Sequence, residues 1–200
     1  MRYLRRLATC TAIHIGTIST AMALEFDARL SNTGATFVLD GVIEPGDADR
    51  FRVYYEEKAD GYRFSVALNS PGGNLAEGIR LGQLFRELGI HTYVVRYPKR
   101  PVDMWGEFDY AVVEAIPGAQ CASACALAFM GGVERVVPTD GALGFHQFYG
   151  GDPQRSSADT MMSTQAISAM VASYLREMGA ELAPVSTGHL GIAMEAQGYA

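Results

Sequence analysis

The feature that most constrains the fold is an apolar strand pattern that ends in two glycines and turns directly into a helix pattern. Residues 64–68 alternate between apolar and other side chains, and residues 69–73 (NSPGG) end the run. In the helix pattern that follows, residues 75–88, the apolar side chains share one face, and Asn74 and Glu77 have the spacing of a capping box. A strand joined to a helix by so short a turn is half of a βαβ unit.

Strand and helix patterns alternate on both sides of this run. Residues 36–43 form a β-branched strand pattern, residues 47–59 a helix pattern and residues 90–96 a third strand pattern. Further on, the sequence predicts a small-residue helix at 123–130, strands at 133–138 and 142–146, and an amphipathic helix at 157–178. The alternation predicts right-handed βαβ units and an α/β fold with a largely parallel sheet.

Two segments depart from this pattern. Residues 97–118 hold three prolines and the only tryptophan, and an irregular stretch of this length within a domain is usually functional or mobile. We interpret it as an insertion. Residues 180–200 are weakly patterned, so we expect an incomplete closing unit at the C-terminus of a single domain spanning residues 24–200.

The N-terminus has the pattern of a secretory signal peptide. Three arginines precede a mostly apolar stretch at 7–21, and Ala21-Met22-Ala23 is an A-x-A type cleavage site. We therefore expect residues 1–23 to be removed and the remainder to be periplasmic or secreted. An uncleaved membrane anchor and an ordinary first element of the fold are the alternatives.

The charge of the chain limits its partners. Removing the three N-terminal arginines takes the formal net charge from −6 to −9, with no Lys/Arg cluster left. Such a chain is poorly suited to nucleic acid or to an anionic membrane surface. Of its three cysteines, Cys121 and Cys125 remain as a pair; without further Cys/His partners a metal site is not expected, nor is any cofactor.

The turn at residues 69–73 suits an oxyanion, because glycines at a strand-to-helix junction can expose backbone N–H groups. Glycine's backbone freedom alone would also explain such a turn. Ser123 lies among small residues at a predicted helix start, where a substrate carbonyl could approach its Oγ and the Ala124 N–H. A serine in that position is more often a simple N-cap.

Cys121 and Cys125 flank this serine at equal distances. Their spacing suits a small-loop disulfide across the turn, but i and i+4 positions of one regular helical turn would be poorly set for a bridge. Both readings stay open. A general base for Ser123 has to come from the three histidines beyond residue 23, and His146 ends a predicted strand that can return to the same sheet edge.

Taken in order, NSPGG, the helix with Glu77-Gly78, the small-residue serine turn and Gly-x-His-Gln at 144–147 resemble the Clp protease proteolytic subunit family of the crotonase superfamily. The resemblance covers residues 36–148 and implies a fold of stacked ββα units. It places the nucleophile on Ser123, the base on His146, and the oxyanion donors on Gly72, with Gly73 adjacent, and Ala124. Periplasmic Clp-like proteins are the more similar subgroup.

The third member of a catalytic triad is not determined by this resemblance. The family carries an aspartate well beyond the histidine, after the long helix, whereas this chain has none after Asp159. Either Glu195 orients the histidine, or Asp152 or Asp159 substitutes, or the pair acts without a carboxylate. Loss of the orienting acid can reduce turnover by about 10⁴ in a serine protease.

Four functions follow as hypotheses. The first is an exported serine hydrolase, a peptidase acting on peptides or unfolded segments, assembled as a homo-oligomer and without an ATPase partner. The second is a Ser–Lys dyad that would use Lys58 or Lys99, which requires a buried lysine. The third is a crotonase-like acyl-CoA enzyme, for which an exported acidic chain is badly suited. The fourth is a catalytically silent binding or assembly module.

Overall fold

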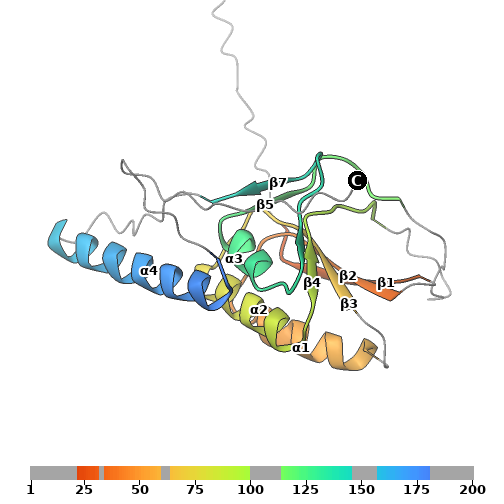
Figure 1. The fold of residues 1–200 in the computed structure, drawn as a ribbon, viewed down its shortest axis with the longest axis horizontal. Helices are drawn as coiled ribbons and strands as arrows, with labels where there is room; N and C mark the ends of the chain where they lie inside the picture. The colour runs from red at the N-terminus through yellow and green to blue at the C-terminus, as the bar shows by residue number, and fades with distance from the viewer. Residues whose placement is uncertain (1–21, 32–33, 60–63, 100–113, 146–156, 181–200) are drawn as a thin grey trace, which may run out of the picture.

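The structure is a computed structural model that describes residues 22–31, 34–59, 64–99, 114–145 and 157–180. Strands and helices alternate along the chain, as Figure 1 shows, and each helix except α2 follows two strands. The first unit is β1 (Glu25–Ser31), β2 (Gly34–Asp40) and α1 (Asp47–Lys58), followed by β3 (Phe64–Asn69) and α2 (Leu75–Glu87). Then come β4 (His91–Tyr93), β5 (Gln120–Ala122) and α3 (Ala124–Met130), and finally β6 (Arg135–Val136), β7 (Ala142–Gly144) and α4 (Ser157–Glu177).

Five strands form the main sheet in the order β1-β2-β3-β4-β6. The pairs β2–β3, β3–β4 and β4–β6 are parallel, and only the edge pair β1–β2 is antiparallel. The predicted α/β class with a largely parallel sheet is confirmed. The antiparallel edge strand was not predicted, although Phe26, Ala28 and Leu30 alternate with polar residues, as in a half-buried strand.

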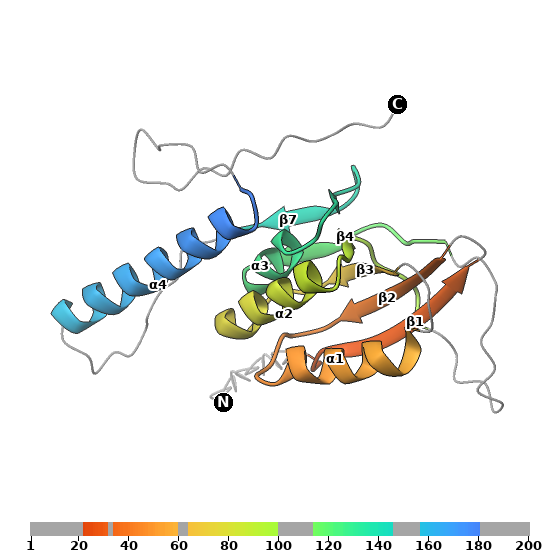
Figure 2. The same cartoon turned by 60° about the horizontal axis from the view of Figure 1, so that its bottom comes forward.

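Helices α1 and α2 lie beside this sheet in Figure 2, and the buried core joins side chains of the sheet to those of α1, α2, α3 and the end of α4. Phe37 on β2 stacks on Phe64 of β3, and Phe51 of α1 meets both Phe37 and Phe85 of α2 edge to face. Val66, Ala67 and Leu68 of β3 are all buried, so this central strand is covered on both faces. Helix α1 was correctly predicted from its aromatic spacing.

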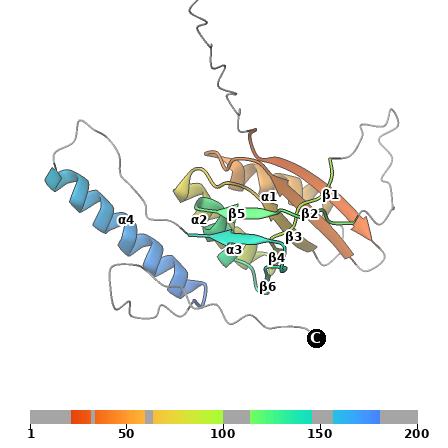
Figure 3. The same ribbon diagram turned by 90° about the horizontal axis from the view of Figure 1, so that it is seen from above.

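A second, two-stranded parallel sheet of β5 and β7 lies over α3, as Figures 1 and 3 agree. It is tied to the main sheet where β3 ends. The Ser70 N–H donates to the Gln120 carbonyl at 2.7 Å, and the Ala122 N–H donates to the Ser70 carbonyl at 3.1 Å. The end of β3 and the start of the serine segment therefore form one continuous ladder.

Helix α4 projects from the body and is held at its C-terminal end (Figure 1). Val171, Tyr174 and Leu175 are buried there, and the Tyr174 hydroxyl donates to the Leu127 carbonyl at 2.7 Å. Met162, nearer its N-terminal end, is exposed. None of the helices within the described residues is long and apolar enough to cross a membrane.

Three predicted elements are shorter in the structure: β4, β6 and β7 occupy only parts of residues 90–96, 133–138 and 142–146. The predicted capping box is half formed. The Glu77 N–H donates to Asn74 Oδ1 at 2.9 Å, but the Glu77 carboxylate accepts from the Ala48 N–H at 2.7 Å instead. The sequence could not predict this contact, because the start of α1 lies next to Glu77 only in the folded chain.

The predicted leader, residues 1–23, lies outside the described residues except for its last two. The Met22 carbonyl accepts from the Val42 N–H at 2.8 Å, and Ala23 forms a bridge with the same residue. Cleavage and export therefore stay predictions.

Candidate functional site

The glycine turn after β3 has the unusual backbone that its sequence indicates. Gly72 and Gly73 lie at φ 104° and 144°, where side-chain-bearing residues are strained. The Gly72 carbonyl accepts from the Ile43 N–H at 2.8 Å, and the Asn74 N–H returns a bond to the Ile43 carbonyl at 2.8 Å. The turn is thereby anchored to the segment that follows β2.

Gly72 lies directly against the predicted nucleophile. A Cβ placed on Gly72 would be 2.7 Å from Ser123 Cβ, 2.6 Å from the Ala122 carbonyl oxygen and 3.1 Å from the Ala124 nitrogen. Only glycine fits at such a distance. The structure thus brings Gly72 next to Ser123 and Ala124, which follow it about fifty residues later in the sequence.

The backbone N–H groups of this junction are not all available. The Gly72 N–H donates to the Oγ of Ser70, a buried serine, at 3.0 Å. Neither the Gly73 N–H nor the Ala124 N–H has an acceptor within the described part of the chain. Among the described contacts, the Gly73 and Ala124 N–H groups therefore remain without an acceptor beside Ser123. Ser70 was quoted in the motif, but nothing in the sequence alone showed that its hydroxyl turns back onto its own turn.

Ser123 occupies a strained position between β5 and α3. It lies at φ 57° and ψ −121°, and it is the one non-glycine residue with positive φ among those the structure describes. Its side chain makes no capping hydrogen bond to α3. The simple N-cap that the sequence left open is therefore not what is observed. Backbone strain of this kind costs of order 1–3 kcal/mol and is concentrated at functional sites.

Cys121 and Cys125 form a disulfide across this turn, which decides the alternative that the sequence left open. Both residues are fully buried. The bridge forms because residues 121–125 are not one helical turn: Cys121 belongs to β5 and Cys125 to α3, and the chain reverses between them.

Two neighbouring elements complete the support of the serine turn. The Ser123 N–H donates to the Gly144 carbonyl of β7 at 2.9 Å. On the other side, α2 packs closely on α3, since a Cβ on Gly78 would lie 2.3 Å from the Ala124 carbonyl oxygen. Gly78 was noted only as part of the family motif, and its role in this helix contact became visible in the structure.

The remaining predicted site residues are not placed by the structure. His146 and Glu195 lie outside the described residues, as does Asp152, and the side chain of Asp159 is likewise not described. Strand β7, however, ends two residues before His146 and pairs with β5, with Gly144 opposite Ala122.

The lysines of the Ser–Lys alternative are on the surface. Lys58 is exposed at the end of α1. Lys99 Nζ pairs with Glu25 Oε2 at 2.9 Å, and this hydrogen bond raises the pKa of Lys99 above its usual value. A lysine that serves as a base needs its pKa lowered by burial. No group of three metal-ligating side chains occurs within the described ranges.

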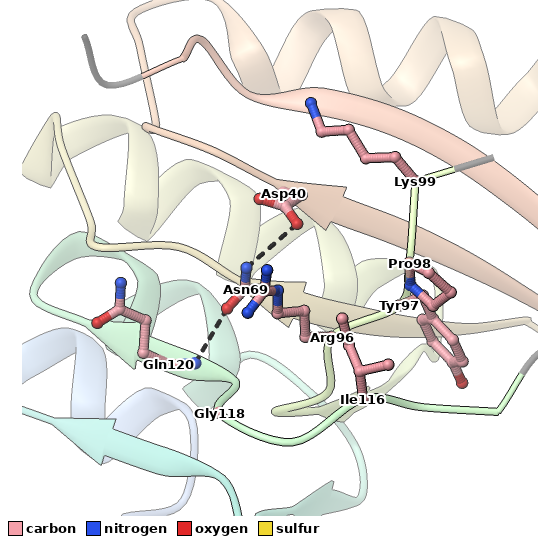
Figure 4. A pocket seen from close by; sticks show the side chains of 9 residues that line it. All are labelled: Asp40, Asn69, Arg96, Tyr97, Pro98, Lys99, Ile116, Gly118 and Gln120. Carbon is pink, nitrogen blue, oxygen red and sulfur yellow. Dashed lines mark hydrogen bonds between the residues drawn. The ribbon is translucent and has the colours of Figure 1, made fainter. Parts of the chain in front are cut away.

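A cavity of about 280 Å³ lies beside the ladder that joins the two sheets (Figure 4). Its lining comes from Asp40 and Asn69, at the ends of β2 and β3, and from parts of residues 96–99 and 116–120. The Asn69 side chain links two walls of this cavity. Its Nδ2 donates to Asp40 Oδ2 at 3.1 Å, and its Oδ1 accepts from the Gln120 N–H at 3.0 Å. Neither Gly72 nor Ser123 is part of this lining.

No protein-family model and no curated protein matches the sequence. The chain is structurally similar to a mutant of ClpP1 from Listeria monocytogenes, with a TM-score of 0.46 and 12% identity over 72% of this chain and 76% of that one. It is similar to the catalytic domain of the ClpP protease from Plasmodium falciparum, with a TM-score of 0.45, 16% identity and coverage of 70% and 64%. For a mutant of the membrane-bound stomatin-specific protease 1510-N, the TM-score is 0.45, the identity 19% and the coverage 68% and 60%. The chain thus spans less than two thirds of the last two, and all three likenesses concern the fold.

Proposed function

We propose that this chain is a serine hydrolase that cleaves peptides or unfolded protein segments, with Ser123 as its nucleophile and His146 as its general base. The observation that carries the proposal is the backbone of Ser123. A strained, side-chain-bearing residue whose hydroxyl does not cap its helix has its Oγ available for chemistry, and it lies against a glycine that leaves room beside it.

The proposed reaction proceeds in two steps. Ser123 Oγ attacks the substrate carbonyl while His146 takes the hydroxyl proton, and the proton then passes to the departing amine. Water, activated by the same histidine, releases the acid and restores the serine. The reach of the chain supports the assignment of His146, because two extended residues beyond Gly144 span at most about 7 Å.

The negative charge that develops on the carbonyl oxygen needs N–H donors. Because Ser70 Oγ already holds the Gly72 N–H, we assign the Gly73 and Ala124 N–H groups as the immediate donors. Gly72 then serves mainly by leaving room, and its own N–H would contribute only if the bond to Ser70 broke.

Glu195 remains our proposed orienting carboxylate, with Asp152 and Asp159 as substitutes. We also propose that the protein acts outside the cytoplasm as a homo-oligomer without an ATPase partner. The signal-peptide pattern supports the location outside the cytoplasm. A disulfide between buried cysteines supports it too, because such bonds are typical of an oxidising compartment.

A fluorophosphonate probe tests the nucleophile directly, because the attacked phosphorus loses fluoride only to an activated hydroxyl. We expect wild type to be labelled, Ser123→Ala to be unlabelled, and His146→Ala to be labelled at least 100-fold more slowly. Ser168→Ala is the matched control: this serine is exposed on α4, its Oγ donates to the Thr164 carbonyl, and labelling should not change.

Equal labelling of wild type and Ser123→Ala would overturn the proposal. A folded wild type that is not labelled at all, but retains a reproducible bound partner, would favour the silent binding module instead.

A further inference from the structure

The disulfide lies symmetrically about the proposed nucleophile. Cys121 and Cys125 stand two residues before and two residues after Ser123, with their Cα atoms 5.1 Å apart. Neither residue is exposed to solvent. The bridge therefore joins the middle of β5 to the first turn of α3 inside the core, and Ser123 lies in the loop that it closes.

This covalent link restricts the backbone between its ends. A strand advances about 3.3 Å per residue, so residues four apart in an extended chain would be about 13 Å apart. To keep the ends at 5.1 Å while one is in a strand and the other in a helix, the chain has to reverse sharply within three residues. The reversal occurs at Ser123. Its φ of 57° is sterically disfavoured, because Cβ comes too close to the neighbouring backbone.

The hydrogen bonds that Ser123 itself makes do not require this conformation. The Ser123 N–H donates to Gly144, a bond that a relaxed turn can also make, and the Ser123 carbonyl accepts from Leu127 at a long 3.4 Å. The side chain contributes no cap. An ordinary helix start would place Ser123 in an extended conformation with its Oγ bonded to the N–H groups of α3.

We infer that the Cys121–Cys125 disulfide is a positioning element for Ser123, which holds the disfavoured turn and keeps the Ser123 side chain against Gly72, with its Oγ not capping α3. The inference rests on the proposed function for its catalytic meaning. Without the bridge, the turn relaxes towards an ordinary N-cap, the helix start is better satisfied, and the serine loses its reactivity while the domain stays folded.

The first experiment measures reactivity with the full chain. In Cys121→Ala/Cys125→Ala, the maximal rate of fluorophosphonate labelling should fall at least 20-fold, whereas the probe concentration for half-maximal rate changes less than threefold. Circular dichroism should show an unchanged fold. If the alanine pair does not fold, Cys121→Val/Cys125→Ala refills the buried volume. A folded cysteine-free variant that is labelled within twofold of the wild-type rate overturns the inference.

The second experiment does not depend on catalysis. Ser123→Gly and Ser123→Ala are compared by thermal melting, once with the disulfide and once in the cysteine-free background. With the disulfide, glycine should melt higher than alanine, because it adopts positive φ without strain. Without it, the order should reverse, because glycine has the more flexible unfolded chain. The same order in both backgrounds would overturn the inference.

The two experiments separate the two proposals. If wild type is not labelled at all, the proposed function fails, and the melting comparison still decides whether the bridge holds the turn. If labelling depends on Ser123 but the melting order is the same in both backgrounds, the function stands and the positioning role fails.

Discussion

The two strand-to-helix turns that meet at the candidate site reach unusual backbone conformations by different chemistry. The β3–α2 turn uses glycines, with Gly72 at φ 104°, and its helix is capped by the Asn74 side chain. The β5–α3 turn places Ser123 at φ 57°, has no side-chain cap, and is closed by a disulfide.

The two turns use different residues because each offers a different group to the candidate site. A turn that offers only backbone groups and space can use glycine, which adopts positive φ at no steric cost. A turn that must present a hydroxyl cannot, so its strain has to be balanced by other interactions. Each of the following comparisons tests one part of this contrast.

The largest effect is expected from Gly72→Ala. Its Cβ would overlap the Ala122 carbonyl oxygen and Ser123 Cβ, and φ 104° would be strained as well. We expect the free energy of unfolding to fall by about 2–4 kcal/mol and labelling at Ser123 to fall more than 100-fold. Chemical denaturation and probe kinetics measure the two effects.

The matched control is Gly46→Ala, because Gly46 has a similar φ of 97° but nothing within 4 Å of the added Cβ. Its free energy of unfolding should fall by only about 1 kcal/mol, because of backbone strain, and its rate of labelling at Ser123 should not change. Similar losses in the two variants would mean that close approach to Ser123 is not what Gly72 provides.

Gly78→Ala should have an intermediate effect through the helix that supports the serine turn. Its Cβ would lie 2.3 Å from the Ala124 carbonyl oxygen, which forces α2 and α3 apart. We expect a loss of about 1–3 kcal/mol in the free energy of unfolding and a several-fold slower labelling rate. A more stable variant, as helix propensity alone would give, would contradict the close contact of the two helices.

The smallest change in the free energy of unfolding is expected at the starts of the two helices α2 and α3. Asn74→Ala should lower the free energy of unfolding by about 1 kcal/mol, because it removes the acceptor for the Glu77 N–H. Ser123→Ala removes no cap and should change it by less than about 0.5 kcal/mol. Equal losses in urea denaturation would show that Ser123 caps α3 in solution.

Much of the fold could be predicted because its elements have strong local patterns. The alternating residues of β3, the aromatic spacing of α1 and the apolar face of α2 each indicate their element without any distant contact. The lengths of β4, β6 and β7 could not be predicted, because a strand ends where its neighbour stops pairing with it. The separate β5–β7 sheet also depends on long-range pairing.

For the candidate site, the residue types and their order were enough to select Gly72, Ser123 and Ala124. Local geometry was not, and the structure decided three points that the sequence had left open or predicted otherwise. Ser123 does not cap its helix, the Gly72 N–H is already bonded to Ser70, and Glu77 caps α1 instead of its own helix. In each case a polar group found a partner that only the folded chain brings near.

The sequence by itself determined the α/β alternation, the glycine turn, and a serine flanked by two cysteines. All of these are local, because side-chain periodicity and backbone freedom act over a few residues. Only the tertiary structure decided that Gly72 touches Ser123 and that Cys121 and Cys125 are bridged. Both facts depend on the sharp reversal between β5 and α3 and on contacts between segments far apart in the sequence, which form only when the chain folds.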